Sequence, residues 1–448
     1  MAKPKDILDK VIDYAQAAMP SEGMIEAAQI FLKKNKVIFC MEEKCFYQYN
    51  GCYYKRIHPE EIHGILISDP YLALLSIAKR DVIVRNISVL ARKSIYDFNK
   101  ENCLCLNNGI IYPLENKFIT HTPDIINTIC LPYNFDSEAV CPLWEKTLVE
   151  IFENDKNKIR VLQEFFGYCL TKDTHYEKAL MLIGDGRNGK STVLRVLEGL
   201  LGEENCAALS LKHIEDPRMA CLLVDKYVNI NSEFGGKYTD FEDAFKTIVS
   251  GEAISVNPKY ATMFRHRPFC KMIFSVNTLP HIEDKTGALY SRLMIISFDR
   301  VFEEDEQNKR LKYQLPEELP GILNWVIKGL QNLYERKNFA VDEYMKKILR
   351  ELRSYNNPIE GFIEDCISVQ KESSTLKGEV YQSYRKWSVE NGFRTAGANK
   401  FGAEFYRLLK GKTKKDEKET FEDQRRIWPN IVLKTHIAVD SGWGEKET

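Results

Sequence analysis

The 448-residue chain lacks the patterns that mark secreted proteins, membrane-spanning proteins and proteins with a structural zinc site. No CxxC pair occurs among its 12 cysteines, and the closest pair, Cys103 and Cys105, has CxC spacing. No histidine stands near a cysteine at zinc-finger spacing, so we predict free thiols in a reducing cytosol and no structural zinc site. No apolar run is long enough to cross a bilayer, and no signal-peptide segment follows Met1, so we expect a cytoplasmic protein without a membrane partner.

The chain also lacks an excess of charge of either sign. Its 63 Lys and Arg residues nearly balance its 64 Asp and Glu residues, which gives a formal net charge of −1. Attraction to nucleic acid must therefore come from local basic patches, since bulk charge supplies none. Hydrophobic residues make up 44% and charged residues 28%, an ordinary globular composition, and the length is sufficient for several domains.

The periodicity of the apolar residues divides the chain into regions of different fold class. Runs at 37–41, 45–49 and 52–57 are rich in aromatic and β-branched residues, and Asn50-Gly51 predicts a hairpin turn between the last two. Strands and helices alternate from Ala179 to about Phe298, which predicts an α/β sheet. We predict an N-terminal α+β domain at 1–140, an α/β domain at 141–305 with a helical lead-in at 141–177, a helical connector at 306–355 and a C-terminal unit at 356–448.

A glycine-rich segment lies between the strand predicted at 179–183 and the helix predicted at 191–201. It fits G-x-x-x-x-G-K-[ST], in which glycines turn backbone N–H groups toward phosphate oxygens and a helix N-terminus adds its positive dipole. Lys190 is predicted to neutralise the β- and γ-phosphates, and Ser191 to bind magnesium. The predicted nucleotide-binding residues are Gly184, Asp185, Gly186, Arg187, Asn188, Gly189, Lys190, Ser191 and Thr192. The segment predicts an ATP hydrolase that uses ATP and Mg²⁺.

Three polar residues follow later strands and complete the predicted catalytic set. Glu233 ends an apolar strand, and we predict that it ligates the magnesium ion and orients or deprotonates the attacking water. Asn277 follows the strand predicted at 271–276 and is predicted to bond the γ-phosphate or the water. Arg292 precedes the strand predicted at 294–298 and is predicted to act as an arginine finger on a neighbouring subunit.

These motifs, taken in order, resemble the superfamily 3 helicases. The likeness is closer to the phage and plasmid primase-helicase group that includes the poxvirus primase-helicase, and it covers roughly residues 100–410. The matching segments are 184–191 for motif A, 228–233 for motif B, 245–260 for the B′ region and 274–280 for motif C, with 106–111 and 163–168 upstream and 362–405 downstream. The resemblance implies an AAA+-like P-loop ATPase core that assembles as a ring, usually a hexamer, and moves on DNA.

The same resemblance places Lys259 on a hairpin in the central channel, where it would contact a DNA phosphate. Arg265, His266 and Arg267 lie nearby in the sequence and form a small basic cluster with it, although an ordinary solvated loop is the alternative. The chain departs from the family at Ser291, where a second arginine is common. It also lacks the N-terminal polymerase-type primase domain, so primase activity is not predicted, and a separate primase or polymerase is a candidate partner.

The C-terminal unit is predicted to be a winged-helix DNA-binding domain. Helices are predicted at 377–391 and 399–410, followed by strand-like segments at 427–428 and 431–434 in a charged, hairpin-like stretch. Lys400 and Arg407 lie on the second helix and are the predicted duplex-DNA contacts. Acidic residues interleave with the basic ones here, so a solvated charged face remains the alternative.

The sequence therefore predicts a ring-forming, ATP-dependent DNA helicase for the replication of a phage, plasmid or other mobile element. Two other functions stay open. One is an origin-binding initiator ATPase that marks or melts DNA without processive unwinding. The other is a P-loop enzyme unrelated to DNA, such as a small-molecule kinase, which would hydrolyse ATP without nucleic-acid stimulation.

Overall fold

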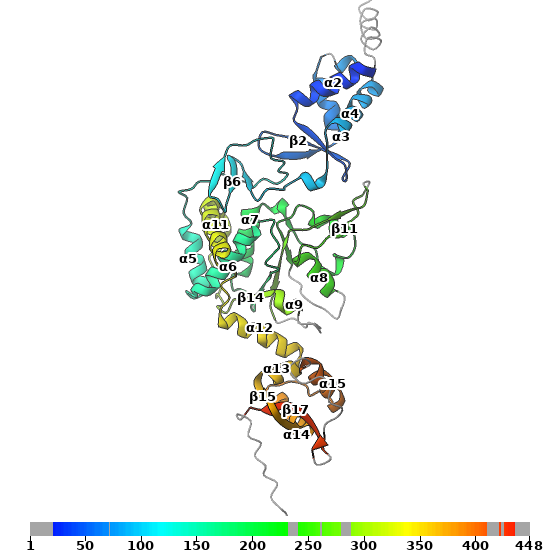
Figure 1. The fold of residues 1–448 in the computed structure, drawn as a ribbon. Coiled ribbons are helices and arrows are strands. Elements are labelled where there is room, and N and C mark those ends of the chain that lie inside the picture. Colours follow the sequence, from blue (N-terminus) through cyan, green and yellow to red (C-terminus); the bar gives the residue numbers. More distant parts are fainter. Residues whose placement is uncertain are drawn as a thin grey trace, which may run out of the picture. The chain divides into compact units, whose positions relative to one another are not determined.

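The computed structural model describes residues 21–70, 72–231, 241–259, 262–278, 288–409, 421–422 and 425–434. The chain forms two compact units, which are treated separately (Figure 1). The larger comprises Met1–Phe234, Tyr238–Thr278 and Arg292–Val341, and the smaller comprises Gly235–Lys237, Leu279–Ser291 and Asp342–Thr448. Within the described ranges, no helix is both long and apolar enough to cross a membrane. The domain boundaries predicted at 140, 305 and 355 stay predictions.

The N-terminal part of the larger unit packs helices against a four-stranded sheet of order β3-β2-β1-β4. Neighbouring strands are antiparallel except β1 and β4, which are parallel. The three predicted strands and their hairpin are confirmed, because Gly51 has φ +101° and the Asn50 side chain accepts bonds from the two amides beyond it. The elements are α2 (Ser21–Lys34), β1 (Val37–Cys40), β2 (Cys45–Tyr49), β3 (Tyr54–Ile57), α3 (Pro59–Ser68), α4 (Ile77–Leu90) and β4 (Arg92–Lys93).

A small antiparallel sheet of order β5-β6-β7 follows. Its strands are β5 (Leu104–Leu106), β6 (Gly109–Tyr112) and β7 (Lys117–Ile119). Gly109 opens β6, and a Cβ there would lie 2.4 Å from the Phe118 ring, so only glycine fits this crossing.

The centre of the larger unit is a parallel five-stranded sheet of order β14-β8-β13-β10-β9. Most residues of its strands are buried, and β8 reads as a continuous apolar run, because a parallel sheet is covered on both faces. The predicted α/β architecture is confirmed as a mixed α/β fold. The strands are β8 (Ala179–Ile183), β9 (Cys206–Ala207), β10 (Val228–Asn231), β13 (Lys271–Val276) and β14 (Leu293–Ser297). The helices are α5 (Pro142–Ile151), α6 (Lys156–Cys169), α7 (Lys190–Leu201), α8 (Phe241–Val249), α10 (Leu311–Gln314) and α11 (Leu319–Arg336). The short helix α9 (Ala288–Arg292) spans the division, since Ala288–Ser291 belong to the smaller unit and Arg292 to the larger.

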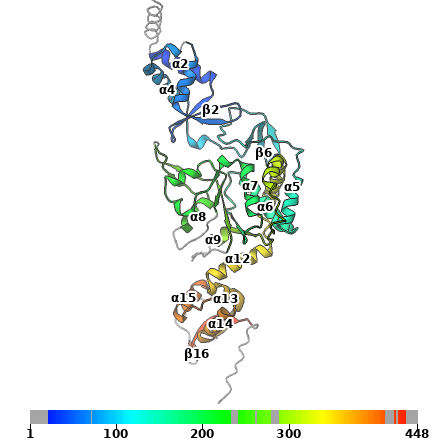
Figure 2. The same cartoon turned by 180° about the vertical axis from the view of Figure 1, so that it is seen from behind.

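Helices α6 and α11 lie side by side (Figures 1 and 2). An ion pair between the buried Glu164 and the partly exposed Arg336 joins them. Gly167 and Gly329 let the two backbones approach, since a Cβ on either would lie within 2.6 Å of the opposite helix. Glu164 is 0% exposed, and both its oxygens are used: one accepts two bonds from Arg336, at 3.0 and 2.7 Å, and the other accepts the Ala340 amide at 2.8 Å. Burial raises the pKa of Glu164, while these donors lower it.

The smaller unit contains helices around an aromatic core and a three-stranded antiparallel sheet of order β15-β17-β16. Phe362, Tyr384 and Phe401 are buried in that core with mutual ring contacts. The two helices predicted here are confirmed, and the hairpin-like stretch is present as the antiparallel pair β16 and β17. Strand β15, which pairs along most of β17, was not predicted. The elements are α12 (Glu343–Asn356), α13 (Pro358–Cys366), β15 (Ile367–Leu376), α14 (Lys377–Glu390), α15 (Ala398–Leu409), β16 (Phe421–Glu422) and β17 (Arg425–Leu433).

A buried cation opens β13. Lys271 is 2% exposed, and its ammonium donates to the carbonyls of Thr171, at 2.6 Å, and Phe269, at 2.8 Å. The ammonium also lies 4.4 Å from the centre of the Tyr168 ring. Burial lowers the pKa of Lys271 to about 8. The carbonyls and ring therefore compensate only part of the desolvation cost.

Replacing Lys271 with methionine tests that charge through the pH dependence of stability. Between the folded pKa of about 8 and the unfolded value of about 10.4, the unfolded state binds the extra proton, so wild-type stability should rise with pH. Relative to Lys271→Met, wild type should gain roughly 3 kcal/mol across this window and nothing below it. Urea unfolding from pH 7 to 10.5 measures the difference. Lys328→Met, at an exposed position on α11, is the control, and a constant Lys271→Met difference across the range would contradict the prediction.

Candidate nucleotide site

The glycine-rich loop joins β8 to α7, as the motif requires. Gly186 and Gly189 have φ +97° and +90°, and a Cβ on Gly189 would lie 2.6 Å from Ile151 of α5. Both positions therefore favour glycine for conformation, and Gly189 also needs it for space. The helix begins at Lys190, so the unsatisfied amides of its first turn face the concave side of the loop. Backbone amides at a helix N-terminus are suited to binding an anion.

Lys190 is held inside the loop. It is 5% exposed, and its ammonium donates to the Gly184 carbonyl and, at 3.0 Å, to the side-chain oxygen of Asn188. Burial lowers the pKa of Lys190, and the nearby Asp185 carboxylate opposes that shift. A phosphate oxygen would give this ammonium a stronger, charge-assisted partner than a carbonyl does.

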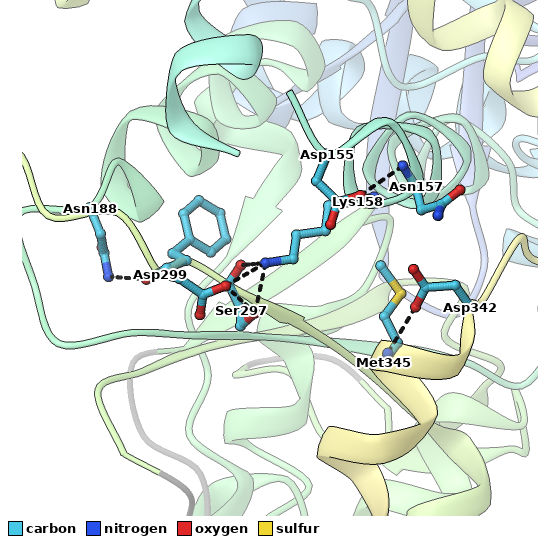
Figure 3. Close-up of polar contacts among 9 residues, drawn as sticks. Asp155, Asn157, Lys158, Asn188, Ser297, Asp299, Asp342 and Met345 are labelled. Atoms are coloured by element: carbon cyan, nitrogen blue, oxygen red, sulfur yellow. Dashed lines mark hydrogen bonds and ion pairs between the residues drawn. The ribbon is translucent and has the colours of Figure 1, made fainter. Parts of the chain in front are cut away.

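The end of β14 is bonded to the loop through Asn188 (Figure 3). Asn188 is 2% exposed and donates to the Phe298 carbonyl at 3.2 Å. The Lys158 ammonium reaches the same strand end from α6 and bonds the Ser297 hydroxyl at 2.9 Å and Asp299 at 2.6 Å. The loop, the lead-in helix and β14 are thus tied at one corner of the sheet.

A pocket of about 610 Å³ opens on the concave side of the loop. Its walls come from the loop and α7, from the carboxyl end of β13, from α5, and from the segment after β14. The lining residues are Thr147, Glu150, Ile151, Arg195, Ser275, Asn277, Phe302, Leu311, Lys312 and those at 186–192 and 306–309. Seven of the nine predicted nucleotide-binding residues, 186–192, line this pocket, whereas Gly184 and Asp185 do not.

The predicted catalytic residues are placed as follows. Asn277 lies directly after β13, exposed, and lines the pocket together with Lys190 and Ser191. Glu233 lies outside the described residues, although the strand before it, β10, sits beside β13 as a motif B strand should.

Arg292 is engaged within its own subunit and does not line the pocket. It ends α9, and its guanidinium bonds Glu177 at 2.7 Å and the Ser250 hydroxyl at 3.3 Å. Glu177 precedes β8 and has φ +48°, and Ser250 follows α8 directly. The finger role of Arg292 stays a prediction.

Lys259 follows the first strand of an antiparallel hairpin formed by β11 (Ile254–Val256) and β12 (Phe264–His266). Lys259 and Arg265 are exposed there, which fits a basic surface. The inclusion of His266 in the basic cluster is wrong, because its side chain is buried and burial lowers its pKa to about 4. His266 is therefore neutral at physiological pH and contributes packing.

In the smaller unit, Lys400 and Arg407 both lie exposed on α15. Arg407 already makes a two-pronged contact with Glu404, at 2.8 and 2.5 Å, so its charge is partly neutralised.

Sequence reasoning missed the pocket walls outside the motifs. Thr147, Glu150 and Ile151 lie on α5 some forty residues before the loop, and Phe302 and Lys312 lie after the last strand. None of them belongs to a recurring pattern. These residues come close to the loop only in the folded protein, where α5 and the segment after β14 pack beside it.

The fold and site together define an α/β protein with a glycine-rich loop and a pocket at the carboxyl edge of a parallel sheet, where such folds bind ligands. Three family models match the chain: "D5 N terminal like" at residues 28–153, "Poxvirus D5 protein-like" at 354–428, and a family of unknown function (DUF5906) at 182–292. Together with the relatives below, these matches support a place for the chain among the D5-like helicase-primase proteins, as its motifs predicted.

Among known proteins, "Putative helicase L207/L206" of Acanthamoeba polyphaga mimivirus is 22% identical over 317 residues, which is 63% of this chain and 32% of the viral protein. The chain thus spans about a third of that relative. A shorter match, 31% over 112 residues, is to gamma-glutamyl phosphate reductase of Shewanella denitrificans and covers 22% of this chain and 27% of the enzyme. The apo C-terminal region of NrS-1 shares the fold, with TM-score 0.54 and 12% identity over 90% of this chain and 98% of that one.

Asn188 offers a test of how the loop is held. Asn188→Ala removes an acceptor from Lys190 and a donor from the Phe298 carbonyl, so stability should fall by about 1–3 kcal/mol and nucleotide affinity by about tenfold. Asn205→Ala is the matched control, because Asn205 is also buried and donates to a helix carbonyl at 2.8 Å, at the far end of α7. Calorimetry and urea unfolding should find both variants destabilised and only Asn188→Ala impaired in binding. Equal nucleotide affinity in the two variants would refute the role of Asn188.

Proposed function

We propose that the chain is a ring-forming, ATP-dependent DNA helicase for the replication of a phage, plasmid or other mobile element. The observation that carries the proposal is the buried Lys190 ammonium at an α-helix N-terminus, facing a pocket large enough for a nucleotide. Matches to two D5-like family models and likeness to a viral protein named as a helicase support the DNA-directed part. We propose a cytoplasmic location.

The site residues fit magnesium–ATP. The glycines at 186 and 189 leave the concave space that a phosphate chain requires, and Lys190 supplies a positive charge within it. The Ser191 hydroxyl, exposed at the pocket wall, would ligate the magnesium ion together with Glu233. When bound, that ion supplies charge neutralisation at the transferring phosphoryl group. Asn277 would hold the attacking water or the γ-phosphate from the end of β13, and Glu233 would accept the proton of the water.

An AAA+-like core requires a neighbouring subunit, and Arg292 is the residue we propose for that contact. It lies outside its own nucleotide pocket and is held by Glu177 on a partly exposed part of the larger unit. A guanidinium in such a place can be offered to another subunit's phosphates without serving its own. We therefore propose a homo-oligomer, with a hexamer as the expected ring.

DNA would be engaged at two places. Lys259 on the β11–β12 hairpin is proposed to contact single-stranded DNA in the channel. The smaller unit combines α13, β15, α14, α15 and β17, an order of helices and strands that suits a winged helix, and Lys400 and Arg407 on α15 are proposed to contact duplex DNA. A separate primase or polymerase is a proposed partner.

Stimulation by DNA separates this function from its alternatives. The ATPase rate should rise with single-stranded DNA, forked DNA should be unwound, and Lys259→Ala should keep basal hydrolysis while losing most of both effects because one phosphate contact is lost. Met263→Ala, an exposed uncharged position on the same hairpin, should behave as wild type. DNA binding without unwinding would instead indicate an initiator ATPase, and ATPase activity indifferent to DNA would indicate an unrelated P-loop enzyme.

The proposed ring makes a prediction about two inactive variants. Lys190→Ala should lose hydrolysis because the phosphate charge is lost, and Arg292→Ala should bind ATP but hydrolyse it slowly, since a finger contributes roughly 10³–10⁵ in rate. Mixed, they should recover activity, because a Lys190→Ala subunit can offer its intact Arg292 to an intact loop on an Arg292→Ala neighbour. ATPase rates across mixing ratios measure the recovery. If subunit exchange is demonstrated and no mixture exceeds its parents, Arg292 does not act in trans.

A further inference from the structure

The pocket extends well beyond the phosphate loop, and its remaining wall is a segment with no known motif. This segment follows β14 and carries an aromatic ring, Phe302, into the lining. Thr147 and Ile151 of α5 also line this pocket. The proposed phosphate contacts leave this part of the pocket without a role.

The Phe302 ring is fixed by a stacked guanidinium. The Arg300 guanidinium lies 4.5 Å from the ring centre and donates to the Glu150 carbonyl at 3.2 Å and to Glu306 at 3.2 Å. The second Glu306 oxygen accepts the Glu303 amide at 3.0 Å. The charge on Arg300 is thus paired, and its plane is held from α5 on one side and from Glu306 on the other.

The backbone of Phe302 is tied to the phosphate loop. Its amide donates to the Arg187 carbonyl at 2.8 Å, and its carbonyl accepts the Gln307 side chain at 3.2 Å. Lys190 lies three residues after Arg187 in the loop, so these bonds fix the position of the ring relative to Lys190. A fixed aromatic ring beside a phosphate seat matches a ligand that carries a planar heterocycle on a phosphate chain.

We propose that Phe302 is the platform on which the nucleobase of the bound nucleoside triphosphate stacks, with Arg300 as the residue that positions the ring. This assignment rests on the proposed nucleotide-hydrolysing function and adds to it the recognition of the base. Stacking of an aromatic ring on a base stabilises binding, and the free energy depends little on which base is bound. The site thus divides into a phosphate seat at the loop and a base platform after β14.

The test compares a ligand that has a base with one that lacks it. Calorimetry on the full chain with Mg²⁺ should give Phe302→Ala about tenfold weaker binding of ATP and binding of inorganic tripolyphosphate within about twofold of wild type. In steady-state hydrolysis the same variant should raise KM about tenfold and leave kcat within about twofold. Phe302→Trp should restore ATP affinity. Val301→Ala, next to the platform and outside the pocket lining, is the matched control.

Each other outcome has a distinct meaning. ATP affinity and KM of Phe302→Ala within twofold of wild type would overturn the platform. Equal weakening of both ligands would also overturn it, because the ring would then only support the loop. Lys190→Ala tests the underlying function separately, and it should weaken the binding of both ATP and tripolyphosphate. Unchanged binding of both ligands would reject the phosphate site at the loop. The Phe302→Ala comparison can still be interpreted in that case.

Discussion

The attachment of the glycine-rich loop to the end of β14 is the constraint on which the site depends. Asn188 links the two by donating to Phe298 and accepting from Lys190, so one buried amide fixes both the loop and its cation. Phe302, four residues beyond Phe298, bonds back to Arg187. The loop and the segment after the strand therefore form one rigid corner. An amide suits this position because it is both donor and acceptor, which no aliphatic or carboxylate side chain provides.

The charges buried in the larger unit are tolerated because each has polar partners at short distance. Lys158 has Ser297 and Asp299, Glu164 has Arg336 and a backbone amide, and Lys271 has two carbonyls. Such pairs contribute little net stability against apolar replacements, but losing one partner leaves an uncompensated charge. These pairs therefore fix the geometry of α6, α11 and the sheet more than they raise the free energy of unfolding.

The elements that carry a local signal could be predicted from the sequence, and those set by tertiary contacts could not. The apolar run of β8, the glycines after it and the amphipathic helices of the smaller unit were recovered, because periodicity and turn chemistry are local. Strand β15 was missed, since its mainly polar residues pair with β17 more than fifty positions away. His266 looked basic, but its burial comes from the fold. Phe302 has no motif, and only packing against Arg300 and Arg187 gives it a place in the site.

The contacts of Arg292 suggest why the proposed nucleotide and DNA sites would respond to each other. Its guanidinium bonds Ser250, and the next residue, Gly251, is packed so closely that a Cβ there would lie 2.4 Å from Thr174 in the loop that carries Glu177. The hairpin with Lys259 begins at Ile254, only a few residues further on. If Arg292 serves a neighbour's phosphate as proposed, the nitrogen that binds Glu177 and Ser250 must change partners. Ser250, near the base of the hairpin, then loses its contact with Arg292 in the same step that completes the neighbouring site. Coupling between two sites requires such a contact, one that is present in one state and absent in the other.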